Sequence, residues 1–64
     1  MKFKIGDKVQ VINNNFKDYL LFGRITNIGI EYEVTFIKDK KKAIYHRKNL
    51  KLIKENKWDE ENIS

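Results

Sequence analysis

The sequence predicts an all-β domain: a small, strongly bent barrel of five short strands, followed by a short acidic tail. Three observations lead to this prediction. Apolar and polar residues alternate over several short runs, which is the period of a half-buried strand. Glycine, asparagine and aspartate separate these runs, and the 64-residue chain has no cysteine, so its stability must come from packing. We therefore expect one domain, with the barrel over residues 1–54 and the tail over residues 55–64.

The first predicted strand covers residues 8–12, where Val9 and Val11 share one face and polar residues occupy the other. The pair Gly6-Asp7 precedes it, and both residue types are common in turns. We expect the chain to turn there and to enter the core along this strand. A long connection over residues 13–19 follows.

The second and third predicted strands, residues 22–28 and 30–37, form a hairpin around Gly29. The third strand has the cleanest alternation, because every second residue from Ile30 to Phe36 is apolar. Both strands should therefore bury one face.

Residues 41–48 predict a fourth strand, joined to the third by a polar hairpin loop over residues 38–41. After a single turn, residues 49–53 predict a short fifth element anchored by Leu50 and Ile53. The predicted core consists of the inward positions of these segments together with Ile5, which shares the alternating phase ahead of the first strand: Ile5, Val9, Val11, Ile25, Tyr32, Val34, Phe36 and Leu50.

The charges suggest how the strands pair. We expect Arg24 and His46 to lie opposite Glu33, with Lys48 opposite Glu31, because opposite charges then meet across neighbouring strands.

Four segments carry a resemblance to a known family: "FKIGDKVQVI", "GRITNI", "YEVTF" and "NLKLI". They resemble the KOW and Tudor-like branch of the small Src-homology-3-type barrels, in which a Gly-Asp turn opens the first strand and Gly-x-Ile-x-x-Ile forms the second. The resemblance covers about residues 3–53 and implies a Src-homology-3-like barrel.

The charge distribution separates a basic body from an acidic tail. The chain has a formal net charge of +5, and thirteen of its 14 basic residues precede Glu55. Such basicity favours nucleic acid or a nucleoprotein as partner. Twelve of the basic residues are lysine, and the richness in Lys, Asn and Ile also indicates AT-rich codons, hence a low-GC bacterium or phage as source.

Two groups of basic residues are candidates for phosphate contacts, one at the hairpin loop and one near the end of the barrel. We expect both to contribute to one basic rim, consisting of Lys38, Lys40, Lys41, Lys42, Arg47, Lys48, Lys51 and Lys54. Aromatic side chains near lysines hold single strands in other small barrels, so the stacking or partner-contact candidates are Phe16, Tyr19, Tyr45 and Trp58.

Each candidate has an alternative role. Hairpin lysines also discourage pairing between sheet edges and keep a small protein soluble. For Phe16 and Tyr19 the alternative that we favour is that they cap the core, and for Trp58 it is that the side chain packs back onto Leu50 or Ile53. The alternative function is that of a phage or mobile-element protein that inhibits or adapts a host protein, with Trp58 as an interface anchor.

The residue inventory argues against catalysis. One histidine, no cysteine and a single serine provide no nucleophile with a base and an orienting group. Glu31 and Glu33 are the closest carboxylates within a strand, and we interpret them as a solvated face. We therefore expect a non-enzymatic cytoplasmic protein without metal, cofactor, small-molecule substrate or membrane partner.

Overall fold

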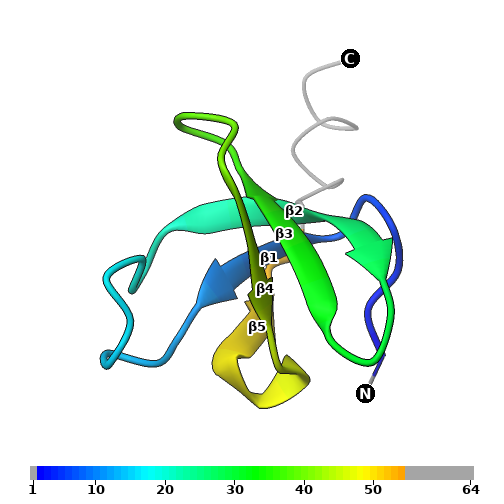
Figure 1. Cartoon of the computed structure of the whole chain (residues 1–64), viewed down its shortest axis with the longest axis horizontal. Helices are drawn as coiled ribbons and strands as arrows, with labels where there is room; N and C mark the ends of the chain where they lie inside the picture. Colours follow the sequence, from blue (N-terminus) through cyan, green and yellow to red (C-terminus); the bar gives the residue numbers. More distant parts are fainter. Residues whose placement is uncertain (1, 55–64) are drawn as a thin grey trace, which may run out of the picture.

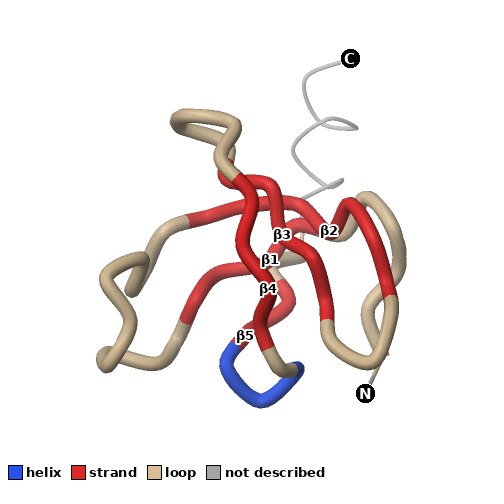
Figure 2. Tube along the Cα trace, in the orientation of Figure 1, coloured by secondary structure: helices blue, strands red, loops and turns tan. Residues whose placement is uncertain are grey.

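A computed structural model describes residues 2–54 as one sheet of five antiparallel strands (Figure 1). The strands are β1 (Lys8–Val11), β2 (Phe22–Ile28), β3 (Tyr32–Phe36), β4 (Lys42–Tyr45) and β5 (Leu50–Leu52), and their order in the sheet is β4-β3-β2-β1-β5. A 3₁₀ turn, η1 (Arg47–Asn49), precedes β5 and is the only helical element in the described residues (Figure 2). The five predicted strands are confirmed, but the sheet is not closed into a barrel. The predicted tail lies outside the described residues.

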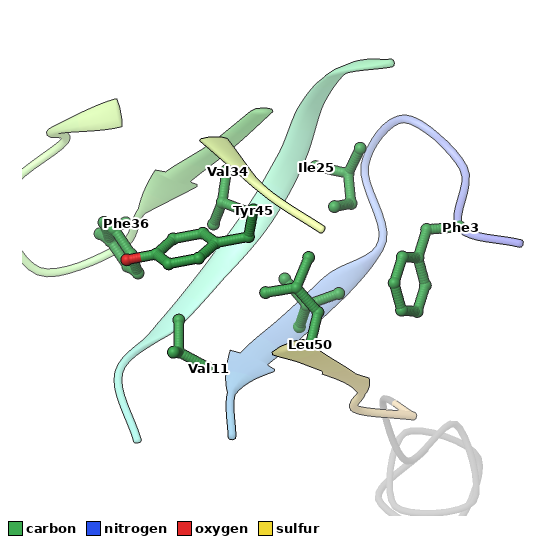
Figure 3. Packing of buried hydrophobic residues seen from close by; sticks show 8 residues of the cluster. Phe3, Val11, Ile25, Val34, Phe36, Tyr45 and Leu50 are labelled. Carbon is green, nitrogen blue, oxygen red and sulfur yellow. The ribbon is translucent and has the colours of Figure 1, made fainter. Parts of the chain in front are cut away.

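The core lies on one face of this sheet (Figure 3). Six predicted core residues are buried: Val9, Val11, Ile25, Val34, Phe36 and Leu50. Tyr32 is only partly buried and packs against the cluster, whereas Phe3 and Tyr45 join it. The prediction for Ile5 was wrong, because this residue is 61% exposed. Ile5 lies in the turn before β1, where the alternation of the strand does not apply, and Phe3 packs edge-on against Tyr32 with 5.1 Å between ring centroids.

The predicted register was also wrong. Arg24 pairs with Thr35, and Glu33 lies opposite Asn27 on β2 and Ile44 on β4. A β-bulge between Ile25 and Asn27 shifts the first hairpin, so that Thr26 is an additional residue in β2. The Thr26 hydroxyl donates to Glu33 Oε1 over 2.7 Å. His46 and Lys48 pair with no strand, because β4 ends at Tyr45 and η1 begins at Arg47.

The predicted turn before β1 is confirmed. Gly6 has a φ of +93°, a conformation that costs a residue with a Cβ more than it costs glycine. Asp7 Oδ2 accepts a hydrogen bond from Lys4 N (2.8 Å), and Gly6 N donates to Ile25 O (2.8 Å). The turn therefore ties the N-terminal segment to the middle of β2. Within residues 2–54 there is no helix of the length and apolar character needed to cross a membrane.

Candidate functional site

The C-terminal basic residues lie around an open groove of about 530 Å³. η1 contributes Arg47 and Lys48, and Lys51 and Lys54 lie on and after β5. Apolar side chains from both ends of the described chain line the same groove: Phe3, Ile12, Leu50 and Leu52. We call this feature the basic groove. Its described lining includes four cationic side chains and no acidic one.

Backbone contacts explain why η1 lies beside the end of β1. Asn49 is the connecting residue: its carbonyl accepts from Ile12 N over 2.9 Å, and its Oδ1 accepts from Asn13 Nδ2 over 3.0 Å. His46 stabilises the start of η1, since its Nδ1 accepts from Lys48 N (3.2 Å) and its carbonyl accepts from Asn49 N (2.9 Å). Local sequence chemistry therefore positions the first two cations.

The pairing of β5 with β1 positions the others. Leu50 lies opposite Val11 and Leu52 opposite Val9, so these leucines face the core side. Lys51, between them, is exposed and pairs with Gln10. A strand that alternates leucine and lysine thus places apolar contact and positive charge within one short segment.

The groove can therefore bind a ligand that is both anionic and partly apolar. Positive charges lining a concave surface with low-dielectric walls concentrate the electrostatic field and raise the local concentration of anions. Phosphates would contact the ammonium and guanidinium groups, and the flat faces of bases would contact the apolar floor.

The hairpin lysines form a second cluster, separate from the groove. Lys38, Lys40 and Lys41 lie in the β3–β4 turn and Lys42 begins β4, whereas η1 follows the other end of that strand (Figures 1 and 2). Lys40 has a φ of 63°, and Asp39 Oδ1 accepts from Lys41 N over 3.1 Å. The eight predicted cations are therefore two clusters at opposite ends of β4, and not one rim.

The four aromatic candidates differ in their placement. Tyr45 is buried in the core, and its hydroxyl donates to Asp18 Oδ2 over 2.8 Å. Burial, this hydrogen bond and the Asp18 charge together raise the pKa of Tyr45 to about 12. The Phe16 ring packs edge-on against the Tyr45 ring with 5.0 Å between ring centroids, while Tyr19 is 43% exposed. Trp58 lies outside the described residues.

The remaining candidates have local roles. Glu33 accepts the Thr26 hydrogen bond, and His46 caps η1 as described above. Among residues 2–54, no three side chains of the types His, Cys, Asp or Glu gather as a metal ion would require.

Sequence reasoning missed one apolar surface. Leu20, Phe22 and Ile37 are exposed and lie together, with Leu21, Lys8 and Lys38, around a second depression of about 480 Å³. The triplet "LLF" was a usable signal, since consecutive apolar residues cannot all face one side of a strand.

No protein-family model, curated protein or solved structure matches the chain.

Proposed function

We propose that this protein is a small non-enzymatic binding module that contacts nucleic acid or a nucleoprotein through the basic groove. The observation that supports this most is the combination of four cationic side chains with an apolar floor in one concavity, without an acidic residue in its described lining. Contacts to phosphates by such groups supply most of non-specific nucleic-acid affinity. Because lysine acts as a point charge, sequence preference should be weak.

The groove is a better candidate than the hairpin cluster for two reasons. Its cations are arranged around a concave surface, whereas the hairpin cations lie on a turn that projects from the sheet (Figure 1). The hairpin also includes Asp39 among its lysines, which lowers its net charge. We assign the hairpin lysines to solubility and to protection of the β4 edge.

We also propose that the sheet belongs to the Src-homology-3-type architecture that the sequence resembles. The antiparallel order β4-β3-β2-β1-β5, the long β1–β2 loop and the 3₁₀ turn before β5 support this assignment. A chain without cysteine suits the reducing cytoplasm, where we place its activity.

The test compares two matched charge reversals in the full chain. One variant carries Lys48→Glu, Lys51→Glu and Lys54→Glu; the other carries Lys38→Glu, Lys40→Glu and Lys41→Glu. Both change the net charge by the same amount, so non-specific attraction falls equally. Binding of fluorescein-labelled DNA and RNA, single- and double-stranded, is measured by anisotropy, and circular dichroism verifies folding.

We expect the groove variant to bind at least about tenfold more weakly than the hairpin variant. Equal losses, or no binding by the parent protein at low salt, would refute the groove as the site.

A protein partner is the second candidate function, because the exposed apolar surface around Leu20, Phe22 and Ile37 is of a kind that marks interaction sites. In this second candidate function, the chain would be a phage or mobile-element protein that inhibits or adapts a host protein. Capture from a low-GC bacterial lysate with and without nuclease separates the two functions, since only a nucleic-acid-mediated complex is lost on digestion.

A further inference from the structure

The surface that sequence reasoning missed has the features of a docking site, and we call it the apolar patch. It consists of Leu20, Leu21, Phe22 and Ile37, with Lys8 and Lys38 at its margin. Leu20 is 49% exposed, Phe22 42% and Ile37 44%. Phe22 lies on the face of β2 opposite the buried Gly23 and Ile25, on the side of the sheet away from the core, whereas Leu21 is partly buried and packs against the core.

Leu20 is held in a conformation that leucine rarely adopts. Its φ is 70°, in the left-handed region, where a side chain without a hydrogen-bonding group gains nothing in compensation. Two hydrogen bonds maintain it: Leu20 N donates to Val11 O (2.8 Å), and Leu20 O accepts from Gln10 Nε2 (3.1 Å). Strain of this kind is concentrated at ligand-binding segments, and here it leaves an apolar side chain half in solvent.

The loop that carries Leu20 is anchored at several points. Tyr45 binds Asp18 and packs against Phe16 in the same loop. At the other side of the patch, Ile37 N donates to Phe22 O over 3.1 Å. The patch is therefore formed before any partner arrives, which lowers the conformational entropy that binding would cost.

The charges of the patch select the chemistry of its partner. Lys8 Nζ lies 5.2 Å from the centroid of the Phe22 ring, and Lys38 lies on the far margin. The six described lining residues include no carboxylate. An apolar anchor flanked by acidic residues would complement this arrangement, whereas the basic body of a second copy, which carries thirteen of the chain's 14 basic residues, would be repelled.

We propose that the apolar patch docks an acidic protein segment through a leucine or aromatic side chain inserted among Leu20, Phe22 and Ile37, with its carboxylates directed at Lys8 and Lys38. The patch shares no lining residue with the basic groove. The proposal is therefore independent of nucleic-acid binding, and the protein would hold two ligands at once.

The test is a titration of the ¹⁵N-labelled full chain with the peptide Asp-Glu-Leu-Phe-Glu-Asp, followed by amide chemical shifts. We expect saturable shifts at residues 8, 20–22, 37 and 38. A peptide with Asn and Gln in place of the acids should bind about two- to fivefold more weakly. Replacing its Leu-Phe anchor with Ala-Ala should cost about fivefold or more.

Variants separate the patch from the groove. Phe22→Ser should weaken peptide binding, and Lys8→Glu with Lys38→Glu should weaken it more than the matched charge reversal Lys51→Glu with Lys54→Glu in the groove. Four outcomes would overturn the proposal: no saturable binding, equal binding of the neutral peptide, peptide shifts centred on residues 50–54, or an oligo(dT) titration that shifts the patch amides. Two results without peptide would also overturn the proposal. One is that the chemical shifts of the patch amides change with protein concentration. The other is that they change when Asp59→Asn, Glu60→Gln and Glu61→Gln are introduced together. Those results would assign the patch to a second copy or to the chain's own tail.

Discussion

Gly23 shows how tightly β2 and β3 are packed at the level of one residue. A Cβ built at this position would meet Val34 Cγ1 and would lie 2.8 Å from Thr35 O. A backbone carbonyl in a paired strand cannot move aside easily. At Gly29, in contrast, the nearest atom to such a Cβ is Glu31 O at 3.9 Å. The close contacts with β3 therefore require glycine at position 23, whereas position 29 has room for a larger residue.

These two glycines give a matched prediction. Gly23→Ala should lower the free energy of unfolding by about 1–3 kcal/mol through overpacking. Gly29→Ala should change it by no more than about 0.5 kcal/mol. Urea unfolding followed by circular dichroism measures both. Equal free energies of unfolding for the two alanine variants would contradict the close packing of β2 against β3 at Gly23.

A second pair tests the core assignment. Phe36 is 3% exposed and Ile5 is 61% exposed, although alternation predicted both to be buried. Phe36→Ala should cost about 3–5 kcal/mol, which is enough to unfold a domain of this size. Ile5→Ala should have an effect within about 0.5 kcal/mol, measured by thermal unfolding. A large loss at Ile5 would show that the N-terminal segment packs differently.

At the level of elements, the hydrogen bond between Tyr45 and Asp18 fastens the β1–β2 loop to β4. Because the pKa of Tyr45 rises from 10.0 to about 12 on folding, the unfolded chain loses this proton first as pH increases. The unfolded state then binds fewer protons than the folded state, so stability falls with pH. The contribution is complete below about pH 10 and disappears progressively towards pH 12.

Tyr45→Phe isolates this effect. The urea midpoint of the parent protein should decrease more between pH 9.5 and 11.5 than that of the variant, because other titrating groups are common to both. The variant should also show faster amide exchange over residues 16–20. If the urea midpoints of the parent protein and of Tyr45→Phe decreased equally with pH, the Tyr45 hydroxyl would not hold the loop.

The elements were more predictable than their pairing. Alternation is a local pattern, so it identified β2 as residues 22–28 and placed Val9, Val11 and Ile25 inside. The register depends on a bulge at Thr26, which charge matching across the hairpin could not reveal. Likewise, the cations of the groove could be proposed from sequence. Its apolar floor could not, because Phe3 and Leu52 line the same groove only in the folded chain.

For the molecule as a whole, the basic groove and the apolar patch give the sheet two separate surfaces of different chemistry. The groove gathers four of the chain's cations around an apolar floor. The patch exposes leucine, phenylalanine and isoleucine between two lysines. On the two proposals above, one small domain would bring an acidic protein segment and a polyanion together.

The most direct test of the groove is the salt dependence of its affinity for fluorescein-labelled oligo(dT). If its three lysines neutralise three phosphates, the slope of log K against log salt should be about −2.1 for a single strand. Lys51→Gln should make that slope less steep by about 0.7, and Lys40→Gln, on the hairpin, should leave it unchanged. A slope near zero, or a slope that changes with Lys40→Gln and not with Lys51→Gln, would contradict phosphate binding in the groove.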